Sequence, residues 1–197
     1  MGVVRFGRRL CIDGADPGTG SAGLVAGGGL QAGGADLIIV TGTSKDAKRL
    51  EIARKLGADH TIDVQTENPL ERIMQITGGK GVDVALDCTA GAGTSAVLLG
   101  VVALKRKAGT LLIQGEMADF PNFQIGKVTV KYITIKSARG HSYHACELAL
   151  QQLASHRFPL EMVTTHTFGL ADADTAIKAV VGGYSPDVIH VSLLPWN

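Results

Sequence analysis

Short apolar segments rich in β-branched residues alternate along the first 115 residues with longer segments of helical period. The apolar segments have the length of buried strands, and they predict strands at residues 9–12, 36–41, 60–63, 83–87 and 110–114. Between them, the helical period predicts helices at residues 45–56, 70–77 and 94–104. This alternation is typical of βαβ units around a parallel sheet, so we expect a doubly wound α/β (Rossmann) fold with about six strands.

The pattern changes after residue 120. Alternating β-branched residues predict a strand at 128–137, and helical spacing predicts helices at about 142–155 and 172–181. The chain closes with an apolar segment at 188–194, which predicts a last strand. This second part of the chain therefore mixes helices and strands without the regular alternation of the first.

A glycine-rich loop follows the first predicted strand and contains the pattern G-x-G-x-x-G, as Gly18-Thr19-Gly20-Ser21-Ala22-Gly23. In a dinucleotide fold the first glycine allows a tight turn, the second lets the backbone approach the pyrophosphate, and the third permits close packing of helix and strand. The helix that follows supplies free N–H groups to the phosphates. Strand, loop and second strand occur here in that order, so we expect a bound dinucleotide.

The end of the second predicted strand indicates which dinucleotide is bound. NAD-specific sites usually carry Asp or Glu there to bind the ribose 2′-hydroxyl, whereas this chain has Gly42. The hydroxyls and cations that follow could meet a 2′-phosphate: Thr43, Ser44, Lys45, Lys48 and Arg49. This composition favours NADP over NAD, although the cations could also form an ordinary solvated helix face.

Charge and composition narrow the classes of partner. With 19 Lys and Arg against 18 Asp and Glu, the formal net charge of +1 gives no support for binding nucleic acid or an anionic membrane. The longest apolar run, at 96–104, is much shorter than a membrane span, and the first ten residues lack a signal-peptide core. The three widely spaced cysteines fit reduced thiols, so we expect a cytoplasmic protein whose partners are small molecules or proteins.

Three stretches, at residues 40–64, 76–94 and 108–115, resemble the coenzyme domain of the medium-chain, zinc-containing alcohol and sorbitol dehydrogenases. The resemblance implies that the adenosine ribose lies at the end of the second strand. Gly42 ends this strand, and Thr43, Ser44 and Arg49 after it would contact the ribose. It also implies that Cys88 and Thr89 flank the adenine and that Gln114 and Gly115 meet the nicotinamide. The pyrophosphate would be held by Gly18, Gly20, Ser21, Ala22 and Gly23.

The same resemblance implies an oxidoreductase that transfers a hydride between NADP(H) or NAD(H) and a small alcohol or carbonyl substrate. It divides the chain into a dinucleotide-binding domain, 1–163, and a C-terminal segment, 164–197, that resembles the end of the family's catalytic domain. The family's zinc ligands belong to an N-terminal domain that precedes the matched region, so we expect no zinc in this chain and name no catalytic residue. Family dimers pair an edge strand, which predicts a homo-oligomer formed through residues 128–137.

Two other functions and one other site stay open at this stage. The loop also resembles the acidic-x-Gly-x-Gly loop of S-adenosylmethionine methyltransferases, although Ala22 stands where that pattern has its last glycine. A non-catalytic nucleotide-binding or assembly module is the second alternative. His141, His144 and Cys146 include atoms that zinc prefers, but no fourth ligand accompanies them, so we expect a helix start and a buried thiol rather than a metal site.

Overall fold

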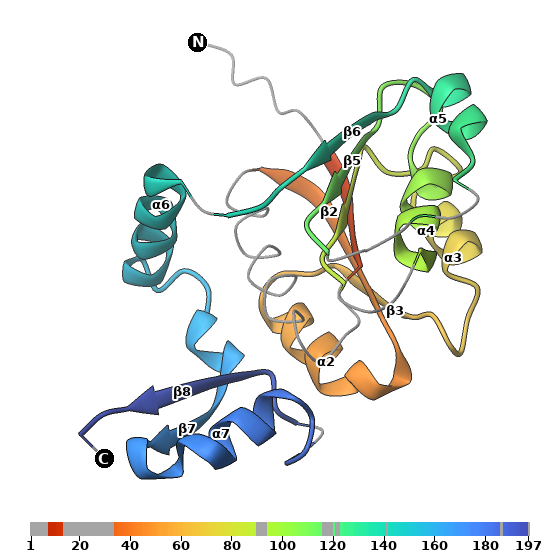
Figure 1. The fold of residues 1–197 in the computed structure, drawn as a ribbon. Coiled ribbons are helices and arrows are strands. Elements are labelled where there is room, and N and C mark those ends of the chain that lie inside the picture. The colour runs from red at the N-terminus through yellow and green to blue at the C-terminus, as the bar shows by residue number, and fades with distance from the viewer. Residues whose placement is uncertain are drawn as a thin grey trace.

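A six-stranded parallel sheet forms the centre of the protein (Figure 1). The computed structural model describes residues 8–13, 34–89, 94–115, 120, 123–140, 142–185 and 187–196. In spatial order, the strands of the sheet are β3 (His60–Asp63), β2 (Ala35–Gly42), β1 (Arg8–Asp13), β4 (Val84–Asp87), β5 (Thr110–Ile113) and β6 (Thr134–Ser137). All of the pairings are parallel, which confirms the predicted doubly wound α/β fold.

Helices cover both faces of this sheet because its buried strands are apolar on both sides. Figure 1 shows α3 (Pro69–Ile76), α4 (Ser95–Ala103) and α5 (Ile125–Lys131) together on one face, and α2 (Ala47–Lys55) on the other. A hydrophobic core lies on each face of the sheet, and alternate residues of β2 point into one or the other. Ile39 packs into the core beneath α3 and α4, whereas Ile38 and Val40 pack into the core beneath α2. The predicted strands and helices up to residue 115 are thus confirmed within one or two residues at each end.

The strand expected at residues 128–137 is wrong over its first half. Residues up to Lys131 form α5, Tyr132 ends that helix in the left-handed conformation at φ 53°, and β6 covers only Thr134–Ser137. Val128 packs against the core from α5, and the Lys131 ammonium donates to carbonyl groups at the end of α4. These tertiary contacts outweigh the strand propensity of the β-branched residues.

The rest of the chain adds a small second sheet. It comprises α6 (Tyr143–Ala154), η2 (Leu160–Val163), β7 (Thr164–Gly169), η3 (Leu170–Asp172), α7 (Ala173–Val180) and β8 (His190–Leu194), with β7 and β8 paired in parallel. The predicted helices at 142–155 and 172–181 and the strand at 188–194 are therefore confirmed. Phe158, Val163 and Ile189 pack into the core that β2 and α2 share. Within the described residues, no helix is long and apolar enough to cross a membrane.

Candidate cofactor-binding site

The carboxyl edge of the large sheet brings the predicted site residues together. The strand order reverses between β1 and β4, and in doubly wound sheets a crevice for ligands opens at this point. Asp13 at the end of β1 is in register with Thr41 of β2 and Asp87 of β4, so the ends of these strands lie side by side. The glycine loop that follows β1 lies outside the described residues, and with it the predicted pyrophosphate contacts of Gly18, Gly20, Ser21, Ala22 and Gly23.

Gly42 ends β2 in a closely packed position. A Cβ atom at Gly42 would lie 3.1 Å from Leu50 Cδ2 and 3.3 Å from Asp46 Cβ, which is tighter than most carbon contacts. The carbonyl oxygen of Gly42 accepts a hydrogen bond from Val64 N at 2.9 Å. A carboxylate side chain at this position would therefore push α2 away from the strand, which gives a packing reason for the glycine.

Thr43 begins the turn into η1 (Ser44–Asp46) and is fixed by a buried carboxylate. Its backbone N–H and its hydroxyl donate to Asp46 Oδ2 at 2.9 Å and 2.5 Å. Asp46 is only 4% exposed, and its other oxygen accepts from Arg49 Nη1 at 3.2 Å. Both oxygens of Asp46 thus accept hydrogen bonds from this chain, and the side chain is buried, so Asp46 shapes the turn rather than facing a ligand.

Arg49 is also engaged within the protein. Its Nη2 donates to the carbonyl oxygen of Val188 at 2.8 Å, a residue 139 positions further along the chain. Only 8% of Arg49 is exposed, and its Nε atom is buried without a hydrogen-bond partner in the described structure. Arg49 therefore joins α2 to the C-terminal segment. Its predicted contact with the ribose remains a prediction and requires the guanidinium to exchange partners.

Ser44 faces an acidic residue that sequence reasoning missed. The Ser44 hydroxyl donates to Asp63 Oδ2 at 2.6 Å, and Gln65 N donates to Asp63 Oδ1 at 2.9 Å. The amide oxygen of Gln65 in turn accepts from Ser44 N at 3.1 Å. Asp63 ends β3 in register with Gly42, so a carboxylate stands beside the residues predicted to meet the ribose, although β2 ends without one. Asp63 is the last residue of the third predicted strand, and this position is the sequence feature that could have identified it as a site residue.

At the other side of the crevice, Asp87 joins the ends of β4 and β5. Its carbonyl oxygen accepts from Gln114 N and Gly115 N, and its Oδ1 accepts from the backbone N–H and hydroxyl of Thr89 at 3.0 and 2.7 Å. Asp87 is 2% exposed and was not among the predicted site residues. The Cys88 thiol is buried and lies 3.5 Å from Gln114 Oε1. The four residues predicted for the adenine and nicotinamide ends thus lie in two adjoining strand ends.

At Gly115 the end of β5 lies in close contact with the end of β4. A Cβ atom there would lie 2.3 Å from Thr89 O and 2.7 Å from Asp87 Oδ2, distances that non-bonded atoms do not reach. Thr89 and Asp87 therefore fill the space where a side chain would stand, and only glycine allows the ends of β4 and β5 to pack this closely.

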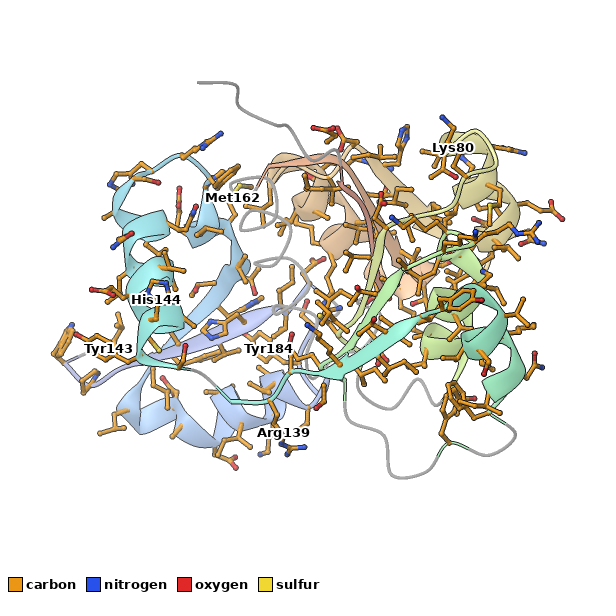
Figure 2. All side chains as sticks on the ribbon, turned by 90° about the horizontal axis from the view of Figure 1, so that it is seen from above. Lys80, Arg139, Tyr143, His144, Met162 and Tyr184 are labelled. Carbon is orange, nitrogen blue, oxygen red and sulfur yellow. The ribbon has the colours of Figure 1, made fainter. Side chains whose placement is uncertain are left out.

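The residues with zinc-binding atoms do not form a metal site in the part of the chain that the structure describes. No group of three or more His, Cys, Asp or Glu side chains there has the arrangement of a metal centre. His144 pairs with Glu147 at 3.6 Å, and His141 lies outside the described residues. The expected buried thiol is wrong, because Cys146 is exposed on α6, none of whose residues is buried. Figure 2 shows His144 on α6, on the far side of the molecule from Lys80. The described residues do not fit a resident zinc ion.

The sheet order and the crevice define the class of protein as one with a Rossmann-type dinucleotide-binding fold. Residues 22–155 match the family model for zinc-binding dehydrogenases, and the chain belongs to that family. The methyltransferase alternative receives no support from this match.

Individual relatives agree with this assignment. The chain is 32% identical over 185 residues to a "Probable alcohol dehydrogenase" of Mycobacterium tuberculosis. The matched region covers 90% of this chain and 49% of the relative. It is 30% identical over 160 residues to a sorbitol dehydrogenase of Halalkalibacterium halodurans, covering 80% of this chain and 45% of the relative. The solved alcohol dehydrogenase of Thermus sp. ATN1 superimposes with a TM-score of 0.80 at 25% identity, over 96% of this chain and 51% of that one. The chain thus spans about half the length of the curated relatives it matches.

Proposed function

We propose that this chain binds a nicotinamide dinucleotide along the carboxyl edge of the large sheet and takes part in hydride transfer to or from a small alcohol or carbonyl compound. One observation carries the proposal: the strand order reverses between β1 and β4, and the adjoining strand ends bring together the residues predicted for the ribose, adenine and nicotinamide. Membership of the zinc-binding dehydrogenase family supports this proposal because the relatives it matches are named as alcohol and sorbitol dehydrogenases.

In this proposal each end of the site receives one part of the cofactor. The adenosine ribose lies over Gly42, Thr43 and Ser44, and the nicotinamide ring lies near Gln114 and Gly115 at the end of β5. The pyrophosphate lies at the loop of residues 18–23. The protein contributes position and exclusion of water, while the hydride is carried by the cofactor itself. We derive no step through zinc, since the described residues do not form its site.

The choice between the two dinucleotides stays a prediction. Gly42 removes the usual acidic residue from β2, and Ser44 offers a hydroxyl near a 2′-phosphate, which favours NADP(H). Arg49, the cation expected to neutralise that phosphate, is buried against Asp46 and Val188 instead. Asp63 adds a negative charge beside Ser44.

Three further features belong to the same proposal. Residues 1–163 act as the dinucleotide-binding domain, and residues 164–197 form a segment equivalent to the end of a catalytic domain. The chain forms a homo-oligomer through the edge of the large sheet. We place it in the cytoplasm because its three cysteines are widely spaced and suit a reducing compartment.

Titration of the purified chain with NADH, NADPH and S-adenosylmethionine tests the proposal. We expect the fluorescence of the reduced nicotinamide to change with a Kd below about 1 mM for at least one dinucleotide, within the usual range for such sites. Calorimetry should detect no heat of binding for S-adenosylmethionine. If neither dinucleotide binds, the proposed function is wrong.

Turnover is a separate measurement from binding. Primary and secondary alcohols, polyols and the corresponding carbonyl compounds would be offered with the preferred dinucleotide while absorbance of the reduced nicotinamide is followed. Hydride transfer with any of them supports the oxidoreductase. Binding without turnover across the whole panel would favour the alternative of a non-catalytic nucleotide-binding module.

A further inference from the structure

Three polar residues at the ends of β2 and β3 form a closed hydrogen-bonded ring. Ser44 Oγ donates to Asp63 Oδ2 at 2.6 Å, Gln65 N donates to Asp63 Oδ1 at 2.9 Å, and Ser44 N donates to Gln65 Oε1 at 3.1 Å. Each of these bonds fixes either the Asp63 carboxylate or the turn that carries Ser44. The charge of Asp63 is therefore held in one place, next to a residue predicted to meet the ribose.

The position of this ring along the sheet is set by backbone pairing. Gly42 and Asp63 are register partners, so the carboxyl ends of β2 and β3 finish together. In Rossmann folds, the residue that distinguishes a ribose 2′-hydroxyl from a 2′-phosphate stands at the end of the second strand. Gly42 has no side chain to perform that task, and Asp63 is the acidic residue in register beside it.

Asp63 is better suited to meet a ligand than Asp46, the other carboxylate near Ser44. Asp46 is 4% exposed and both of its oxygens accept hydrogen bonds from Thr43 and Arg49. Asp63 is half-buried, and Ser44 and Gln65 are exposed. Each carboxylate oxygen can accept about two hydrogen bonds, so Asp63 keeps acceptor capacity after bonding Ser44 and Gln65.

Two of the nearby cations are paired with other groups. Lys48 Nζ lies 3.4 Å from Glu51 Oε2, and Arg49 is bonded to Asp46 and Val188. A carboxylate accepts a hydrogen bond from a ribose hydroxyl, whereas it repels the two negative charges of a phosphate monoester.

We propose that Asp63 determines the nucleotide specificity of this site by accepting a hydrogen bond from the unphosphorylated adenosine ribose and repelling a 2′-phosphate, so that NAD(H) binds more tightly than NADP(H). This inference rests on the proposed dinucleotide-binding function. It reverses the preference that the sequence alone predicts, because the sequence does not show that β3 delivers a carboxylate to the end of β2.

The experiment compares the Kd values of NADH and NADPH for the wild-type chain, Asp63→Asn and Glu67→Gln. The side chain introduced by Asp63→Asn loses the charge, but its oxygen can still accept from Gln65 N and its NH2 group can donate to Ser44 Oγ. Glu67→Gln removes one charge from the exposed turn four residues further on. Circular dichroism and urea unfolding check that each variant is folded.

We expect wild-type protein to bind NADH more tightly than NADPH. In Asp63→Asn the ratio of the two Kd values should shift towards NADPH by about fivefold or more, the effect of one nearby charge in a partly solvated site. Higher salt should shrink this shift because surface charges are screened. Glu67→Gln should keep NADH as the tighter ligand.

Each other outcome overturns the inference in a different way. If both dinucleotides bind but Asp63→Asn leaves their ratio unchanged, Asp63 does not set specificity and the proposed function stands. If wild-type protein binds NADPH more tightly than NADH, the preference predicted from Gly42 is correct and the inference is wrong. If neither binds, the proposed function fails and the inference with it.

Discussion

At the scale of single residues, Gly115 gives the sharpest test of the site's geometry. In Gly115→Ala the added methyl group would meet Thr89 O and Asp87 Oδ2 at 2.3 and 2.7 Å, so the ends of β4 and β5 must separate. We expect a loss of stability of about 1–3 kcal/mol in urea unfolding, as for other overpacked positions, and weaker dinucleotide binding. Gly126→Ala is the matched control, since a Cβ there meets nothing within 4 Å and helix propensity favours alanine. Equal stability of Gly115→Ala and wild type would contradict this account.

Residues predicted from strand ends are found where the sequence placed them, but their partners could not be predicted. Gly42, Thr43, Ser44, Thr89 and Gly115 follow apolar strands, and the carboxyl ends of parallel strands meet at one edge. The hydrogen bond between Ser44 and Asp63 joins residues 19 apart, and that between Arg49 and Val188 joins residues 139 apart. Such pairs depend on strand order and on the docking of the C-terminal segment, which local patterns do not contain.

At the scale of secondary-structure elements, α5 shows where local patterns fail. The β-branched residues between 128 and 137 favour a strand, yet only Thr134–Ser137 forms one. The alternating pattern does not show that residues 128–131 will pack beside the end of α4. The last carbonyl groups of α4 need hydrogen-bond donors. Lys131 reaches these groups only if its own segment is helical, and Nζ then lies 2.7–3.0 Å from the carbonyl oxygens of Val101, Val102 and Leu104.

Lys131→Met tests this helix-capping contact. The variant removes the ammonium from the carbonyl end of α4, and we expect it to lower the free energy of unfolding by about 1 kcal/mol at neutral pH. Lys127→Met, an exposed change on the same helix, should have little effect. Urea unfolding of both variants checks the difference. No loss of stability in Lys131→Met would show that water satisfies these carbonyl groups equally well.

The same residue predicts a dependence on alkaline pH. Burial lowers the pKa of Lys131, and the nearby charges of Lys127 and Arg106 lower it further. A lowered pKa means that the unfolded chain binds more protons than the folded one between the two pKa values, so stability from this group rises with pH there. The stability difference between wild type and Lys131→Met should therefore grow as the pH approaches the ordinary lysine value of about 10.4. A difference that falls over this range would contradict the direction of the shift.

At the scale of the whole molecule, apolar groups remain exposed beside the open edge of the large sheet. β6 is the last strand of this sheet, and each of its four residues is exposed. Val130 and Tyr132 next to it are 73% and 71% exposed, and Ile135 within it is 38% exposed. An edge strand has unpaired backbone donors and acceptors, which a second copy of the same strand can satisfy. We therefore expect a homodimer formed by pairing of β6 with its counterpart.

Substitutions at two isoleucines near this edge distinguish an effect on dimer formation from an effect on folding. Ile133 and Ile135 differ in burial, so an introduced charge should act differently at the two positions. Ile133 is 9% exposed and belongs to the core around β5, so Ile133→Lys should unfold the chain. Ile135→Lys should leave the circular dichroism spectrum and urea midpoint close to wild type while converting the dimer to a monomer in light scattering. The comparison of the two variants therefore reports on the edge and the core independently.

Two features of β6 argue against a dimer, and they indicate which result would contradict it. The strand has four residues and carries Lys136, and short edge strands with a lysine are also how proteins avoid pairing with one another. If these features dominate, light scattering will show a wild-type monomer at micromolar concentration, and Ile135→Lys will change nothing. If the exposed apolar groups dominate, the wild-type mass will be that of two chains and will fall only when the charge stands at Ile135. Because one strand presents both opposing features, the measured mass of the wild-type chain decides which of them prevails.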